Sequence, residues 1–252
     1  MKLFRLSLII MLFAGCTGQT YKVTTDSMSN TFNTGQVLEL KKKTSLDKGD
    51  IVFFRPNRNP KKQEETWLFR VVAYSGDILE IKDGNVIVND SLVELPENAR
   101  ILYSISLTSA FDMKDFRENT VKQIGEGKYI GYLTRSEYSK ILKFQNITSI
   151  ERIIKSRGEP SNGIVRNNSN DSWNEDQFGP LTIPSPGDKI KINLINRELY
   201  KDILSGLEPD STVLVKEKLY FLMGDNRSNA VDSRYIGLVT ESNIIGSAEE
   251  EH

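Results

Sequence analysis

A short unit recurs along this chain: a tight turn containing glycine, followed by a strand-like apolar run. It occurs as TGQVLEL at 34–40, KGDIVFF at 48–54, SGDILEI at 75–81 and PGDKIKI at 186–192. Glycine supplies the backbone conformation that the turn needs, and a half-buried strand follows. The run ILEIKDGNVIVND (78–90) also predicts a hairpin that turns at Asp83-Gly84. The chain is therefore expected to form antiparallel strands joined by tight turns.

The sequence changes in character between about residues 100 and 215. Residues 111–124 and 135–144 have helical spacing, 157–188 is rich in Gly, Pro and Asn, and 196–204 favours a short helix. Strand-like sequence returns at 211–225. We expect a mainly β protein with an antiparallel sheet core and an α+β insertion. The expected core consists of residues 16–95 and 215–252, and the second of these ranges ends in an acidic tail. The expected inserted subdomain is 96–214.

Composition excludes several classes of function. The chain has 33 Lys and Arg against 34 Asp and Glu, so no basic surface points to nucleic acid. Cys16 is the only cysteine, which rules out an internal disulfide. The only histidine, His252, is the last residue. The sequence therefore offers almost no residues from which to build a His-based zinc site or a Ser-His-Asp triad. We therefore expect no metal and no cofactor.

The first 15 residues have the pattern of an export signal. Lys2 and Arg5 precede an apolar run at 6–13, which is too short to span a bilayer. The sequence FAGC that ends at Cys16 resembles the lipobox of bacterial lipoproteins. The resemblance implies cleavage before Cys16, lipids on that residue, and anchoring on the periplasmic face of the inner or outer membrane. The alternative is a free cysteine after an ordinary signal peptide.

Four further motifs follow in order. They are TTDSMSNTFNTGQVLEL (24–40), GDIVFF (49–54), FRVVAYSGDILEIKDGNVIVND (69–90) and GDNRSNAVDSR (224–234). They resemble the nucleophile segment, the next strand, the lysine segment with its hairpin, and the last signature of type I signal peptidases. Each alone would be a weak signal, but four in this order are a strong one. WNEDQFGPLTIP (173–184) also resembles the insertion of Bacteroidetes-type members. The resemblance implies a signal-peptidase-like β core and a serine endopeptidase that removes N-terminal signal peptides.

The resemblance assigns roles to residues of the nucleophile segment. Ser27 takes the nucleophile position, and its backbone N–H and the Thr25 hydroxyl match the donors that stabilise the developing oxyanion. Met28 matches a residue that lines the small pocket for the substrate side chain before the cut. Asn30 stands where the family usually has Pro, and Phe32 where it usually has Leu.

The resemblance also implies a substrate groove and a supporting motif. An extended peptide would add as a strand beside residues 65–69, against Trp67 and Leu68, and Trp67 with Phe69 would narrow the groove or simply fill the core. The last signature would fold against the catalytic strand as a charge network; ion pairs on a well-capped surface turn are the weaker alternative. Its supporting residues are Gly224, Asp225, Asn226, Arg227, Ala230, Asp232, Ser233 and Arg234.

The general base of the family is missing. In the family a lysine precedes Arg-Val-Val, buried so that its pKa falls and its neutral amine accepts the serine proton. Here that residue is Phe69, and Arg70 cannot substitute because a guanidinium stays protonated. Ala230 stands where the family has a serine that contacts the lysine, which suits an apolar neighbour. The standard mechanism is therefore absent unless another lysine reaches the serine. The candidates are Lys48, Lys82 and Lys128.

Three functions follow from these residues. We favour a weakened or inert relative that still binds extended, signal-peptide-like segments outside the cytoplasmic membrane. The second is an active signal peptidase with a relocated lysine base. The third is a structural lipoprotein that uses the insertion, around Trp173 to Pro186, as a surface for a protein partner. The expected partners are an extended peptide, the membrane through the lipid anchor and a possible protein at the insertion, but no nucleic acid.

Overall fold

The computed structural model describes residues 18–56, 65–109, 120–204 and 210–250. Within these ranges the protein is mainly β, with several antiparallel sheets, as the sequence predicted. The glycines before four of the strands have φ between 93° and 100°, a region that side chains other than glycine rarely adopt. The recurring turns of the sequence are therefore real turns, and strands follow them.

The central sheet has five antiparallel strands in the order β16-β15-β4-β3-β17. They are β16 (Val239–Thr240), β15 (Leu219–Met223), β4 (Trp67–Tyr74), β3 (Ile51–Phe54) and β17 (Ile244–Ala248). Every residue of β3 and β15 is buried, because both faces of the sheet are covered. This sheet brings residues 51–74 together with residues 219–248.

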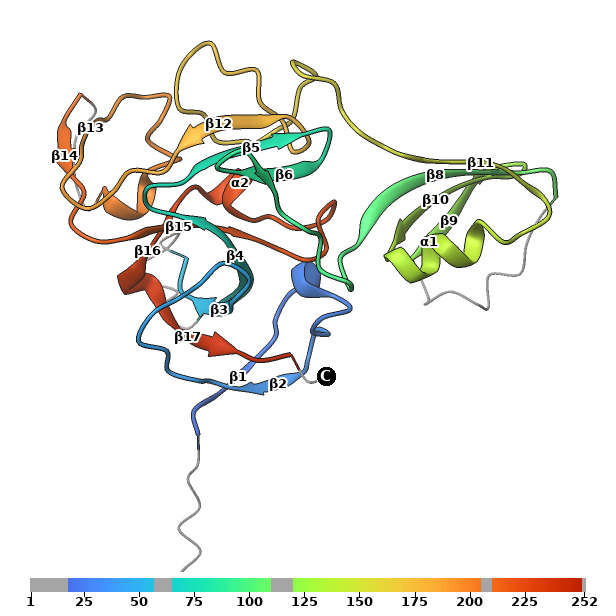
Figure 1. The fold of residues 1–252 in the computed structure, drawn as a ribbon, viewed down its shortest axis with the longest axis horizontal. Helices are drawn as coiled ribbons and strands as arrows, with labels where there is room; N and C mark the ends of the chain where they lie inside the picture. Colours follow the sequence, from blue (N-terminus) through green and yellow to red (C-terminus); the bar gives the residue numbers. More distant parts are fainter. Residues whose placement is uncertain (1–17, 57–64, 110–119, 205–209, 251–252) are drawn as a thin grey trace, which may run out of the picture.

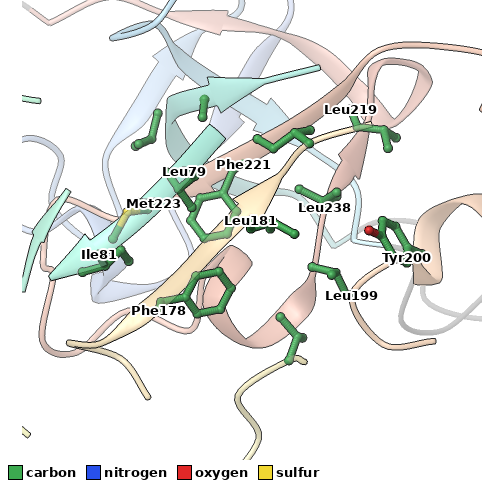
Figure 2. Packing of buried hydrophobic residues seen from close by; sticks show 14 of the residues in the cluster. Leu79, Ile81, Phe178, Leu181, Leu199, Tyr200, Leu219, Phe221, Met223 and Leu238 are labelled. Atoms are coloured by element: carbon green, nitrogen blue, oxygen red, sulfur yellow. The ribbon is translucent and has the colours of Figure 1, made fainter. Parts of the chain in front are cut away.

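A second sheet covers one face of the first. Its order is β12 (Phe178–Thr182), β5 (Ile78–Lys82), β6 (Asn85–Val88) and β7 (Ser91–Leu92). The β5–β6 hairpin turns at Asp83 and Gly84, both with positive φ, which confirms the predicted turn. Figure 2 shows the cluster between these sheets, where Phe178, Leu181 and Leu79 meet Phe221 and Met223.

A third sheet projects away from the rest of the molecule (Figure 1). It contains β11 (Ile147–Arg152), β8 (Ile101–Leu107), β10 (Lys128–Leu133) and β9 (Val121–Gly125), and α1 (Arg135–Ile141) packs beside it. Its small apolar cluster, which includes Ile105, Tyr129 and Ile141, is separate from the main core. A capping box of Thr134 and Glu137 starts α1.

The helix predictions had mixed outcomes. The helix expected at 135–144 is confirmed by α1, although it ends at Ile141. The helix expected at 111–124 is wrong for Val121 to Ile124, which lie in β9 because they pair with β10; residues 111–119 lie outside the described part. Only a 3-10 turn, η3 (Lys201–Ile203), forms in 196–204.

Smaller elements complete the described fold. They are the pairs β1 (Thr20–Lys22) with β2 (Val37–Glu39) and β13 (Lys189–Lys191) with β14 (Thr212–Leu214), the 3-10 turns η1 (Asp26–Met28) and η4 (Glu241–Asn243), and the short helix α2 (Ser233–Ile236). No helix in the described ranges combines the length and apolar character needed to cross a bilayer. Cys16 and the export-signal segment lie outside those ranges.

Candidate active site

The proposed nucleophile, Ser27, lies in the 3-10 turn η1. Thr25 caps this turn, and the Ser27 N–H donates to the Thr25 Oγ1 at 3.4 Å. The Thr24 hydroxyl donates to the Thr66 carbonyl at 3.4 Å and so holds the turn beside the start of β4. The two expected oxyanion donors thus contact each other through a long hydrogen bond.

The last signature holds the backbone on both sides of Ser27. The Asn226 N–H donates to the Ser27 carbonyl at 3.0 Å. The Asn226 side-chain amide donates to the Asp26 carbonyl and to the Ser29 hydroxyl, each at 3.1 Å. One buried asparagine therefore holds the nucleophile segment through three hydrogen bonds.

Gly224 is required by close packing. A Cβ on this residue would lie 2.5 Å from the Ser27 carbonyl oxygen and 2.5 Å from the Ala230 Cβ. Both distances are far below van der Waals contact, and the Ser27 neighbour is backbone. The absence of a side chain here allows the end of β15 to touch the nucleophile turn directly.

Phe69, which the resemblance assigns to the position of the family's lysine, is almost fully buried. It belongs to the same apolar cluster as Met28 and Ala230. Its ring lies 5.5 Å from that of Phe54 and 6.1 Å from that of Trp67, between ring centres. The position that the resemblance assigns to the family's lysine is therefore filled by an aromatic ring in an apolar cluster.

The three candidate lysines make no hydrogen bond to Ser27. The Lys48 amine pairs with Asp77 at 2.8 Å and lies 5.1 Å from the centre of the Tyr74 ring. The amines of Lys82 and Lys128 do not reach the serine hydroxyl either, and within the described part of the chain that hydroxyl has no hydrogen-bond partner. The described part of the chain also contains no cluster of potential metal ligands.

An ion pair that the sequence reasoning missed joins β4 to the last signature. Arg70 Nε donates to Asp225 Oδ1 at 2.9 Å, and Arg70 Nη2 donates to Oδ2 at 2.7 Å. The Thr31 hydroxyl donates to the same carboxylate at 2.6 Å. Burial lowers the pKa of Arg70, but the hydrogen bonds and charge of Asp225 outweigh this and raise it. The alternation of side chains along a strand was the available signal for this pair, because it places Arg70 on the face of β4 opposite Phe69.

The remaining charges form a second pair, separate from the first. Arg234 donates to both oxygens of Asp232 at 2.8 Å, and the Asp232 Oδ2 accepts from the Gly224 N–H at 3.1 Å. The Ser233 hydroxyl accepts from the Leu222 N–H at 2.9 Å. Arg227 pairs with no carboxylate among the described residues; its Nη1 donates to the Met223 sulfur at 3.6 Å. The expected charge network is thus two separate pairs and one isolated arginine.

Asn30 has a backbone conformation that proline cannot adopt. Its φ is +82°, whereas the ring of proline holds φ near −65°. Its Oδ1 accepts from Arg100 Nη2 at 2.9 Å. The proline that the resemblance to the family would place here could therefore not hold this backbone conformation.

The expected substrate-contact residues differ in exposure. Met28 and Leu68 are buried, and the Met28 sulfur accepts from the Asp225 N–H at 3.3 Å. Trp67 is half-buried, with its indole N–H donating to Glu65 at 3.1 Å.

In the segment predicted to be a partner surface, Trp173 is buried against Phe178, with ring centres 4.4 Å apart, so its ring is not on the surface. The substrate and partner assignments remain predictions.

Comparison with known proteins supports the family. Signal peptidase I of Aquifex aeolicus (strain VF5) is 26% identical over 262 aligned residues, 98% of this chain and 80% of the relative. Signal peptidase I of Buchnera aphidicola is 52% identical over 40 residues (subspecies Acyrthosiphon pisum, strain APS) and 54% identical over 35 residues (subspecies Schizaphis graminum, strain Sg). These two matches span 16% and 14% of this chain, and only 13% and 11% of the length of the Buchnera relatives.

The family model gives the wider match. It is described as "Signal peptidase, peptidase S26" and matches residues 1–139 and 196–251, which together are more than half of the chain. The stretch between them contains β11, β12 and β13, within the part that the sequence predicted to be inserted. The protein therefore belongs to the signal peptidase family, peptidase S26.

Proposed function

We propose that this protein binds extended, signal-peptide-like segments outside the cytoplasmic membrane and has lost most or all of the family's peptidase activity. The observation that carries the proposal is the buried Phe69 directly before Arg70-Val71-Val72. A serine hydroxyl is a weak nucleophile until a base accepts its proton. Removing a catalytic base costs on the order of 10⁴–10⁶ in rate. The lipid anchor at Cys16 is part of the same proposal.

An open strand edge beside the nucleophile supports peptide binding. The pairing of β15 with β4 begins at Arg70 opposite Met223, whereas Leu68 and Phe69 pair only with β3 among the described strands. An extended peptide forms main-chain hydrogen bonds along such an edge. Gly224 follows β15 directly and touches Ser27, so the edge ends at the nucleophile turn.

The residues to which the resemblance assigns the oxyanion donors lie close together, which supports the proposal. The Thr25 hydroxyl and the Ser27 N–H lie together, and Asn226 holds the surrounding backbone. The slot occupied by Phe69 is apolar, and burying a charged lysine there would cost several kcal/mol, so its pKa would fall toward the range of a general base. Restoring the lysine and its neighbouring hydroxyl should therefore restore some chemistry.

The test uses the full chain in detergent and a preprotein with an Ala-x-Ala cleavage motif. The unmodified protein should bind a matching peptide without cleaving the preprotein. Phe69→Lys with Ala230→Ser should cleave slowly, and adding Ser27→Ala to this double variant should abolish the cleavage. Circular dichroism of each variant reports whether it is folded.

Each outcome separates one function from another. Cleavage by the unmodified protein that Ser27→Ala abolishes would establish a relocated base and refute the proposal. A folded double variant that binds peptide but stays inactive would mean that the donors around Ser27 no longer fit a transition state. Absence of peptide binding by the unmodified protein would leave the structural-lipoprotein function.

A further inference from the structure

A cavity of about 600 Å³ lies between β4 and residues 93–98, next to the nucleophile segment. Asn30, Thr31, Arg70 and Arg227 line it, whereas Ser27, Thr25 and Phe69 do not. It is therefore distinct from the strand edge described above. Its volume is within the range of small-molecule sites, about 300–1,000 Å³.

Arg227 is the unusual side chain of this cavity. It is only 8% exposed and has no carboxylate partner among the described residues; its hydrogen-bond partner is the Met223 sulfur, and its Nε has none. Burial lowers its pKa to about 10, although the nearby charges of Asp225 and Asp232 act in the opposite direction. Buried charges in proteins are normally paired, because desolvating an ion is costly. A smaller cavity of about 20 Å³ also touches Arg227, but it has room for about one water, which cannot neutralise a charge.

The neighbouring cations are already neutralised. Arg70 pairs with Asp225 and also contacts Glu250 at 3.3 Å, and Lys48 pairs with Asp77. Glu250 lines the same cavity, so a carboxylate already enters it from the C-terminal segment, yet that carboxylate does not reach Arg227. Among the cations that line this cavity, Arg227 is therefore the one without a carboxylate in hydrogen-bond contact within the described part of the chain, and Asp225 and Asp232 act on it only through their charge.

The rest of the lining narrows the class of ligand. Val71, Val93 and Leu95 contribute apolar surface, whereas Glu94 and Glu97 lie on the exposed side and disfavour multiply charged anions. A guanidinium binds a carboxylate through two parallel hydrogen bonds. We propose that this cavity binds an organic carboxylate, which pairs with Arg227 while its apolar part packs against Val93 and Leu95.

Calorimetric titration of the full chain in detergent tests this inference. The probes are hexanoate, the peptide Ala-Ala-Leu with a free C-terminus, the same peptide as an amide, and inorganic phosphate. At least one of the two carboxylates should bind, and the peptide amide and phosphate should bind at least tenfold more weakly. Comparing hexanoate with the free peptide distinguishes a free acid from a peptide C-terminus.

Variants then locate the site. Arg227→Met should weaken carboxylate binding about tenfold or more, Arg227→Lys should weaken it less, and Glu250→Gln should strengthen it by removing a competing carboxylate. Arg166→Met, at an exposed arginine elsewhere, is the matched control and should bind like the unmodified protein.

Three results would overturn the inference. They are no binding of either carboxylate to the unmodified protein, equal binding of carboxylate and amide, and unchanged binding by folded Arg227→Met. If Arg227→Met does not fold, two measurements still test the inference. They are the comparison of the free peptide with its amide and the effect of Glu250→Gln on carboxylate binding. The proposal does not depend on peptidase activity, so it can fail or succeed independently of the proposed function.

Discussion

Arg70 and Asp225 form an ion pair with two hydrogen bonds, of 2.9 and 2.7 Å, one residue away from Phe69. The strand that lacks the family's lysine thus keeps its attachment to the last signature. Asp225 is fully buried, and Arg70 is the only cation whose guanidinium touches its carboxylate among the described residues. This pair maintains the geometry of the site separately from any chemistry at Ser27.

Removing one partner of that pair should be costly. Asp225→Asn or Arg70→Met should each destabilise the protein by about 3 kcal/mol, because the other charge stays buried without its partner. The double variant should lose much less than the sum of the two. Urea unfolding of the four proteins measures this, with Lys201→Met, in an exposed pair with Glu198, as a control that should change stability by less than about 1 kcal/mol. Additive losses would contradict the pairing.

Restoring the family's proline after the nucleophile turn should damage the fold. Asn30→Pro should cost about 2 kcal/mol or more, because proline cannot adopt the φ of +82°. Asn30→Gly keeps that backbone conformation accessible and loses only the contact with Arg100, so it should cost about 1 kcal/mol or less. Thermal unfolding compares the two. Equal stability of the proline and glycine variants would refute the left-handed conformation.

Alkaline pH should weaken the fold partly through Tyr200. Burial raises the pKa of its hydroxyl to about 12, against about 10 in an unfolded chain. Between these values the unfolded state has released its proton and the folded state has not, so this contribution is intact below pH 10 and falls as pH rises toward 12.

Tyr200→Phe isolates that contribution. By pH 11 the unmodified protein should have lost about 1.4 kcal/mol more stability than the phenylalanine variant, relative to pH 9. Urea unfolding at the two pH values gives the difference. Tyr21→Phe, in the half-buried middle of β1, is the control. Parallel pH profiles for the unmodified protein and Tyr200→Phe would count against the buried hydroxyl as the cause.

Cys16→Ser should release the mature protein from membranes. The expectation rests on the lipobox-like FAGC sequence and on lipidation as the means of anchoring. Fractionation of cells and a carbonate wash measure the distribution, and an unchanged signal-peptide sequence before residue 16 is the control for export. Retention of the serine variant after the wash would refute the lipid anchor.

The strands and turns were predictable because their signals are local. Gly-Asp turns and the Asp83-Gly84 hairpin depend on backbone preferences of a few residues, and both were found. The helix prediction was wrong for 121–124 because strand pairing with β10 outweighed the helical spacing of the sequence. Tertiary pairing of this kind overrides local propensity.

The candidate site was predictable only in part. Motif order indicated that Ser27 and the last signature would come together, and Asn226 does contact the nucleophile segment. Alternating Asp and Arg in one short segment suggested one network, but the partner of Asp225 is Arg70, from a strand 155 residues earlier. The isolation of Arg227 depends on which groups surround it in space, which spacing along the chain does not specify.

The packing of Phe69 couples its position to that of Ala230. Its ring is buried with Phe54 and Trp67, in the cluster that contains Ala230. A single change to lysine would place an amine among aromatic rings without its hydroxyl neighbour, and a single change of Ala230 to serine would bury an unpaired hydroxyl. Each single change is therefore expected to lower the free energy of unfolding, whereas lysine and serine introduced together can pair with each other, so the two positions are coupled.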